Sequence, residues 1–155
     1  MEIRSLRDDE YEILKTFLYE AIFVPEGCET PSFDIVYRPE LAVYYESFGS
    51  APADNALVLD DDGRICGCCW SRIMDDYGHV SDDTPSLAIS LLPEYRGRGY
   101  GTRLLSDLLD MLRSRGFSRA SLAVQKANYA VRMYEKAGFR TVDENDEEYI
   151  MVCML

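Results

Sequence analysis

A glycine-rich hexapeptide in the second half of the chain constrains its fold more than any other feature. Arg96-Gly97-Arg98-Gly99-Tyr100-Gly101 follows an apolar run from Leu87 to Leu92 and precedes leucines at helical spacing, from Leu104 to Leu112. A strand, a glycine turn and a helix N-terminus together direct several backbone N–H groups toward one point, where they bind phosphate. Glycine lets the backbone approach a ligand closely, and the helix end and two arginines add positive charge. We therefore expect a polyphosphorylated ligand at this turn.

The spacing within this turn excludes two common phosphate-binding loops. A P-loop requires Lys followed by Ser or Thr after its last glycine, and no such pair follows Gly101. A dinucleotide fingerprint requires a third glycine at the position of Thr102. The pattern that fits is Arg/Gln-x-x-Gly-x-Gly/Ala, with Arg96, Gly99 and Gly101 at the defined positions. This pattern resembles the acyl-CoA pyrophosphate loop of the GNAT superfamily of N-acyltransferases.

A second motif lies about thirty residues further along the chain. The segment from Asn128 to Phe139 reads Asn-Tyr-Ala-Val-Arg-Met-Tyr-Glu-Lys-Ala-Gly-Phe. It is similar to the GNAT signature Asn-x-Ala-x-x-Leu-Tyr-Glu-x-x-Gly-Phe, which follows the fifth strand in that family. Because the two motifs are independent and each stands in the right element, the resemblance is specific.

Hydrophobic periodicity and turn residues predict the order of the elements. The expected helices are Tyr11–Ile22 with Asp8 or Asp9 as its N-cap, one that begins at Pro39, Gly99–Arg115 and Asn128–Ala137. The expected strands are Ile3–Leu6, Ala56–Leu59, Ile65–Met74, Ser86–Leu92, Ala120–Val124, Arg140–Val142 and Tyr149–Met154. The order β-α-α-β-β-β-α-β-α-β-β resembles the GNAT fold from end to end. It implies one α/β (α+β) domain over residues 1–155, with a mixed, mostly antiparallel sheet and helices on both faces.

Composition narrows the class of partner and the compartment. The formal net charge of −12 disfavours nucleic acid and anionic lipid as partners, and it attracts a cationic substrate such as an amine. No apolar stretch approaches the ~20 residues of a membrane span, and the N-terminus carries no secretory signal. The five cysteines are an odd number, and Cys66, Cys68 and Cys69 lack the second cysteine pair of a zinc site. We expect reduced, structural thiols, no metal and a cytoplasmic protein.

The resemblance to GNAT enzymes implies roles for individual residues. It places Ile89, Ser90 and Leu91 along the pantetheine arm of acetyl-CoA, and the pyrophosphate on Arg96, Gly97, Arg98, Gly99, Tyr100, Gly101 and Thr102. Asn128 and Met133 also match cofactor-binding positions, and Tyr134 matches the tyrosine beside the thioester sulfur. A phenol with a pKa of ~10 can protonate a leaving thiolate whose conjugate acid has a pKa of ~8.5. Tyr134 is therefore the expected general acid.

The general base is left open by the sequence. The strand segments Ser86–Leu91 and Ser121–Val124 carry no carboxylate. His79, Asp82, Asp83 and Glu26 lie in loops that could reach the acceptor, and His79 is the tentative base because histidine titrates near neutral pH. A water chain, or an amine that needs no base, is an equal alternative. Asp75, Asp76 or Asp82 could match the charge of a cationic acceptor.

The expected function is an acetyl-CoA-dependent N-acetyltransferase that acts in a ternary complex. The acceptor is a primary amine on a small molecule or a protein N-terminus, and the choice between monomer and homodimer stays open. One alternative is a nucleotide-phosphate-binding enzyme that uses the same turn. Another is a non-catalytic acyl-CoA-binding or interaction module with the same fold. The absence of a carboxylate on the expected strands fits this alternative.

Overall fold

The computed structural model describes all 155 residues, which form one seven-stranded sheet in the order β1-β2-β3-β4-β5-β7-β6. Every neighbouring pair is antiparallel except β4 and β5, which run parallel. The strands are β1 (Glu2–Ser5), β2 (Asn55–Asp61), β3 (Arg64–Arg72), β4 (Ser86–Leu91), β5 (Arg119–Gln125), β6 (Phe139–Glu144) and β7 (Glu148–Met154). The helices are α1 (Ile13–Ala21), α2 (Pro39–Ala42), α3 (Tyr100–Ser114) and α4 (Ala130–Ala137). The expected fold class and element order are confirmed.

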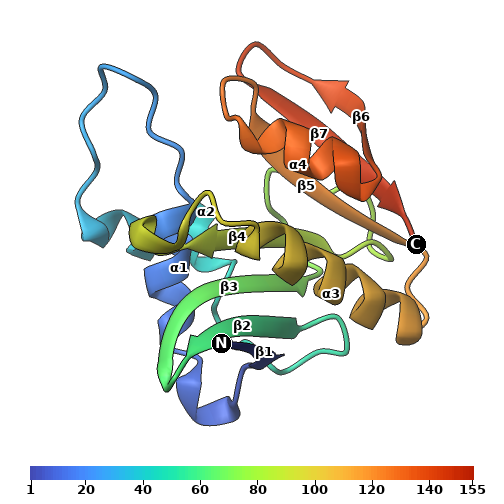
Figure 1. The fold of residues 1–155 in the computed structure, drawn as a ribbon. Coiled ribbons are helices and arrows are strands. Elements are labelled where there is room, and N and C mark those ends of the chain that lie inside the picture. The colour runs from blue at the N-terminus through green and yellow to red at the C-terminus, as the bar shows by residue number, and fades with distance from the viewer.

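Two hydrophobic cores lie on opposite faces of this sheet. Figure 1 shows α3 and α4 on one face, with α1 and α2 on the other. The leucines of α3 point inward at helical spacing and form the first core with one face of the strands. The second core packs α1 against the opposite face. Successive strand residues alternate between these cores, so Cys68 belongs to the second and Cys69 to the first.

Two short turns behave as their residues predict. Asp62 and Gly63 join β2 to β3 with positive φ angles of 53° and 96°, the conformation of a type I′ hairpin turn. Gly116 follows α3 with a φ of 89°, as expected for a glycine that ends a helix. The helices are too short or too polar to cross a membrane.

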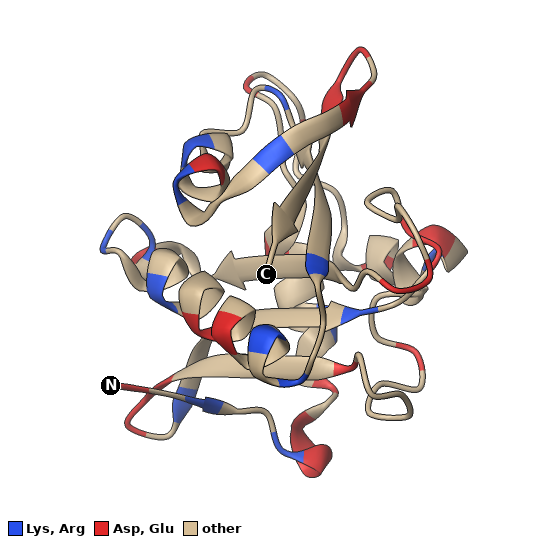
Figure 2. Ribbon diagram, turned by 90° about the vertical axis from the view of Figure 1, so that its right-hand side faces the viewer, with Lys and Arg blue, Asp and Glu red and all other residues tan.

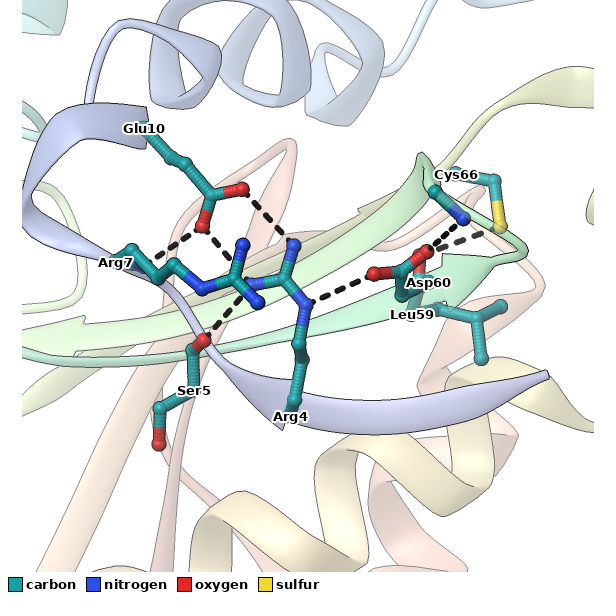
Figure 3. Close-up of polar contacts among 8 residues, drawn as sticks. Arg4, Ser5, Arg7, Glu10, Leu59, Asp60 and Cys66 are labelled. Atoms are coloured by element: carbon teal, nitrogen blue, oxygen red, sulfur yellow. Dashed lines mark hydrogen bonds and ion pairs between the residues drawn. The ribbon is translucent and has the colours of Figure 1, made fainter.

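The start of the first helix differs from the sequence prediction. Asp8–Glu10 forms a separate 3-10 turn, and α1 begins only at Ile13. Figure 3 shows contacts that hold this turn, in which the guanidinium of Arg4 donates to both carboxylate oxygens of Glu10 at 2.9 Å. Arg4 also donates to Asp60 on β2 at 2.9 Å. These contacts fix the 3-10 turn to the edge of the sheet.

Two other boundaries also differ. The helix that begins at Pro39 is only one turn long, because it ends at Ala42 and continues as irregular turns. The acidic segment that was expected to be a loop from Asp143 to Glu148 is shorter, since β6 extends to Glu144 and β7 begins at Glu148. Figure 2 shows the acidic residues at the projecting tip of this hairpin.

Candidate active site

The glycine turn places a row of unpaired N–H groups at the start of α3. β4 is followed by a 3-10 turn, Pro93–Tyr95, and then by Gly97 and Gly99, whose φ angles are 75° and 86°. The N–H groups from Gly97 to Thr102 donate to no acceptor within the chain. A helix leaves its first N–H groups free, and here the glycines extend that row backward. The turn is therefore built to bind an anion with several oxygen atoms.

Arg96 is engaged within the protein rather than directed at this anion site. Its Nε donates to the carbonyl oxygen of Leu91 at 3.0 Å, and its Nη2 donates to the carboxylate of Glu20 at 2.9 Å. Its backbone N–H donates to Pro93 at 3.2 Å. The sequence prediction assigned the positive charge of Arg96 to a phosphate, whereas the structure pairs that charge with Glu20. Arg98 is exposed and forms no ion pair, so its charge is available.

β4 and β5 are paired at one residue only. Ser86 pairs with Ser121, and beyond that point the strands separate, as Figure 1 shows. Because Leu92 donates its N–H to Cys66 on β3, the alternating N–H groups of Ile89 and Leu91 face the side of β5. These two residues thus supply the free strand edge that an extended ligand can pair with. The open end of the separation lies beside the glycine turn.

Ser90 does not share this edge, although the sequence prediction grouped it with Ile89 and Leu91. Its position in the alternation directs its N–H toward β3. Its hydroxyl donates to the carbonyl oxygen of Phe17 on α1 at 2.6 Å. In this structure Ser90 therefore fixes α1 against β4.

Tyr134 lies on α4 and packs into the first core. Its ring packs edge-to-face against Phe139 at 5.9 Å between centroids. Burial raises the pKa of the Tyr134 hydroxyl, with a second contribution from the Cys69 thiol. Cys69 itself lies on β3, opposite Ile89 of β4. A phenol is protonated at neutral pH, so the Tyr134 hydroxyl can donate to a developing thiolate, although the raised pKa makes it a weaker acid.

The other two residues of the second motif have different surroundings. Asn128 accepts the N–H of Ala130 at 2.9 Å and so stabilises the start of α4. Met133 faces α3, because a Cβ added at Gly101 would lie 3.5 Å from its Sδ. Met133 and Thr102 together line a cavity of about 230 Å³ between α3 and α4. Thr102 and Met133 are therefore brought together, and Asn128 is not among the lining residues.

The loop between β3 and β4 carries His79 across β5. The carbonyl of Gly78 accepts the Ser121 hydroxyl at 2.7 Å, which holds the loop on the strand. His79 Nε2 lies 3.3 Å from the exposed carboxylate of Asp82, and its buried Nδ1 has no partner. The proposed base is thus paired with a surface acid, and no contact joins it to Tyr134.

Asp82 and Asp83 lie at the far end of β5 from the glycine turn. They line a cavity of about 430 Å³ with Phe117 and Ile73. Asp83 accepts hydrogen bonds from Ser81, Thr84 and Arg119, which lower its pKa to about 2. The charge of Asp83 is therefore matched within the protein, whereas Asp82 is exposed beside His79.

Asp76 is the acidic residue of this loop with a distinctive environment. Its Oδ1 accepts the Ser86 hydroxyl at 2.8 Å, and its Oδ2 accepts the Tyr44 hydroxyl at 3.1 Å. Burial raises the pKa of Asp76, and the two hydroxyl hydrogen bonds oppose that rise. Asp75 beside it is exposed. No sequence signal separates the two, because only the folded loop turns one inward.

Comparison with known proteins decides the family. The model of the acetyltransferase (GNAT) family matches residues 16–139. The chain belongs to the GNAT family. An acetyltransferase of Pectobacterium atrosepticum is 32% identical over 145 residues, which cover 92% of this chain and 90% of that protein. GNAT enzymes use acetyl-CoA as cosubstrate, and this chain is an acyltransferase of that kind.

Other GNAT proteins share parts of the sequence or the whole fold. The [ribosomal protein bS18]-alanine N-acetyltransferase of Haemophilus influenzae is 37% identical over 70 residues, 45% of this chain and 48% of that protein. The PaiA N-acetyltransferase of Thermoplasma acidophilum, solved in complex with coenzyme A, superposes with a TM-score of 0.72 at 22% identity, covering 99% and 98% of the two chains. YncA of Salmonella typhimurium, solved with acetyl-CoA, gives 0.72 at 20% identity over 100% and 94%.

Proposed function

We propose that this GNAT enzyme transfers the acetyl group of acetyl-CoA to a primary amine, by direct attack in a ternary complex. One observation supports it above the others: the free edge of β4 leads into a turn with a row of unpaired N–H groups. This arrangement suits a ligand with an extended, hydrogen-bonding arm and a polyphosphate at one end. The partial likeness to a ribosomal-protein-alanine N-acetyltransferase favours nitrogen as the acceptor atom.

The donor is held by backbone groups more than by charged side chains. In this proposal the N–H groups from Gly97 to Thr102 bind the pyrophosphate, with Arg98 as the nearby cation. Ile89 and Leu91 pair with the pantetheine arm through their outward N–H groups. Met133 lines the donor site with Thr102. Arg96, Ser90 and Asn128 hold the surrounding elements in place.

The chemistry requires an oxyanion donor and a proton for the leaving group. An N–H of the free β4 edge that the pantetheine arm leaves unpaired can donate to the oxygen that becomes negative when the amine attacks the thioester carbon. Tyr134, which is protonated at neutral pH, gives its proton to the departing sulfur. All five cysteines are unpaired, which fits an enzyme of the reducing cytoplasm.

A screen of acceptors tests the proposal. The protein is incubated with acetyl-CoA and a panel of primary amines and N-terminal peptides, alongside alcohols of the same shape, while release of the CoA thiol is followed. We expect release with at least one amine and none above background with the alcohols. If acetyl-CoA binds but no amine promotes release, the non-catalytic module is the better account.

A further inference from the structure

The carboxylate of Asp76 is partly buried and has no cationic partner. Both of its oxygens accept hydrogen bonds from neutral hydroxyls, those of Ser86 and Tyr44. None of the ion pairs in the chain includes Asp76. A carboxylate withdrawn from water is unfavourable unless an opposite charge compensates it. The site therefore favours the arrival of a cation.

Its position relates Asp76 to the reacting atoms. Ser86, which binds it, is the residue at which β4 and β5 are still paired, so Asp76 lies at the closed end of the strand separation. Ile89, whose N–H lies on the free edge, is three residues further along the strand from Ser86, or about 10 Å. In the proposed site an ammonium and water bridge Asp76 and this edge. The donor would enter from the open end, beside the glycine turn.

Asp76 and Tyr134 approach this region from opposite faces of the sheet. Ser86 and Ser90 share one face by alternation, and the Ser90 hydroxyl bonds to Phe17 of α1. Asp76 is thus on the side of α1 and α2, whereas Tyr134 packs into the core under α3 and α4. An acceptor bound at Asp76 would approach the thioester carbon from the side of α1 and α2. Tyr134 would approach the leaving sulfur from the opposite face of the sheet.

The groups that face Asp76 are acidic or neutral. Tyr44 approaches from the segment after α2 and Ser86 from β4, and the pKa of Tyr44 is raised by burial, by Asp76 and further by Glu148 and Tyr77. Glu148, the first residue of β7, also has a raised pKa because of burial and the neighbouring Glu147. No lysine or arginine forms an ion pair with either carboxylate.

We propose that Asp76 is the acceptor-binding carboxylate: it binds the primary ammonium of the acceptor and takes, through water, the proton that the nitrogen must lose. The proposal rests on the acetyltransferase function proposed above. The acidic surroundings select amines with no carboxylate close to the nitrogen, such as alkylamines, polyamines, lysine side chains and peptide N-termini. Free α-amino acids are disfavoured, because their carboxylate would lie near Asp76 and Glu148.

This assignment accounts for every proton that is transferred in the reaction. The ammonium gives one proton to Asp76, and the nitrogen lone pair then forms the C–N bond with the thioester carbon. Collapse of the oxyanion breaks the C–S bond, and the sulfur takes the proton of Tyr134. The nitrogen loses its second proton to solvent, which reprotonates Tyr134, and Asp76 releases its proton to water. The net change is one ammonium and one thioester converted to one amide, one thiol and one proton.

The pH dependence of kcat/KM tests this role with 1,4-diaminobutane, phenethylamine and glycine as acceptors, using wild type, Asp76→Asn and Asp75→Asn. Wild type should have a higher kcat/KM for the two amines than for glycine. Its kcat/KM should not change with pH above the pKa of Asp76, because the ammonium form is the substrate. Asp76→Asn can use only the small fraction of the amine that is unprotonated at a given pH. Its kcat/KM should therefore be about 100-fold lower at pH 7 and rise about tenfold per pH unit. Asp75→Asn, which changes an exposed charge next door, should stay within about twofold of wild type.

Tyr44→Phe provides a second measurement, which would not change if Asp76 had only a structural role. It removes a hydrogen bond that lowers the pKa of Asp76, so the acidic limb of the profile should shift to higher pH. If Asp76→Asn is poorly folded, Tyr44→Phe alone decides the matter through the direction of this shift. An unmoved limb in Tyr44→Phe, or a wild-type profile in a folded Asp76→Asn, overturns the proposal while acetyl transfer stands. If wild type binds acetyl-CoA but acetylates none of the panel, the proposed function fails and this role with it.

Discussion

The guanidinium of Arg96 lies 2.9 Å from the carboxylate of Glu20, and this ion pair joins the glycine turn to the end of α1. The same guanidinium donates to the carbonyl oxygen of Leu91, the last residue of β4. Arg96 therefore holds three elements together at the open end of the strand separation. Its charge is matched before any ligand arrives, which leaves Arg98 as the free cation of the turn.

Replacement of each arginine by glutamine distinguishes these two roles. Arg96→Gln keeps a side-chain N–H that can reach Leu91, so the affinity for acetyl-CoA should change by less than about threefold. Arg98→Gln removes an unmatched charge, so affinity should fall about fivefold to tenfold at low salt. Calorimetric titration at two ionic strengths measures both effects. A large, salt-dependent loss in Arg96→Gln with none in Arg98→Gln would reverse the assignment.

The glycine turn can be tested with a matched pair of variants. Gly99 and Gly116 both have positive φ, at 86° and 89°, and a Cβ at either would meet nothing within 4 Å. Valine at either position should therefore introduce similar backbone strain, about 1–3 kcal/mol. Only Gly99→Val places a branched side chain beside the N–H groups of the turn. We expect acetyl-CoA to raise the thermal midpoint of Gly116→Val, as in wild type, and to leave that of Gly99→Val unchanged.

An equal rise in both valine variants would show that the ligand does not bind at this turn. If the two variants differ in stability without ligand, their midpoints are each compared with and without acetyl-CoA. The ligand-induced shift, rather than the midpoint itself, is the quantity to compare.

The Arg4–Glu10 contact predicts a specific pH dependence of stability. Two hydrogen bonds from Arg4 lower the pKa of Glu10 to about 2. The folded state thus holds Glu10 ionised more strongly than the unfolded chain does, so the stabilisation is complete above the ordinary glutamate pKa and disappears as pH falls toward 2. Because the pair is partly solvated, we expect a contribution of about 1 kcal/mol.

The measurement is the thermal midpoint of Glu10→Gln between pH 7 and pH 3. At pH 7 the variant should melt about 2–4 °C below wild type, and the gap should narrow as the pH is lowered. Glu12→Gln removes the same charge from an exposed side chain nearby and should stay close to wild type throughout. A gap that widens on acidification would contradict the assigned origin of the stabilisation.

Local patterns in the sequence predicted most of the fold. The Asp62-Gly63 turn, the leucine stripe of α3 and the glycine after it each depend on residues near one another in the chain. Such features follow from backbone preference and hydrophobic periodicity, which the sequence displays directly. The two motifs also predicted the glycine turn before α3 and the helix that carries Tyr134.

Features that join distant segments could not be predicted. The partner of Arg96 is 76 residues away, and Tyr44 is 32 residues from Asp76. Nothing in the sequence ranks Asp76 above Asp75, because burial of one and exposure of the other depend on how the loop packs against β5. His79 was favoured for its ordinary titration range, a property that carries no information about its neighbours.

The kcat of Tyr134→Phe, at saturating acetyl-CoA and amine, tests the central claim most directly. Phenylalanine keeps the packing of the ring against Phe139, and the Tyr134 hydroxyl is the only group removed. If that hydroxyl protonates the leaving thiolate, kcat should fall about 100-fold or more while the Kd for acetyl-CoA stays near that of wild type. An acetyl donor with a more acidic leaving thiol should narrow the difference. An unchanged kcat with weaker binding of acetyl-CoA would contradict the account and make Tyr134 a wall of the donor site.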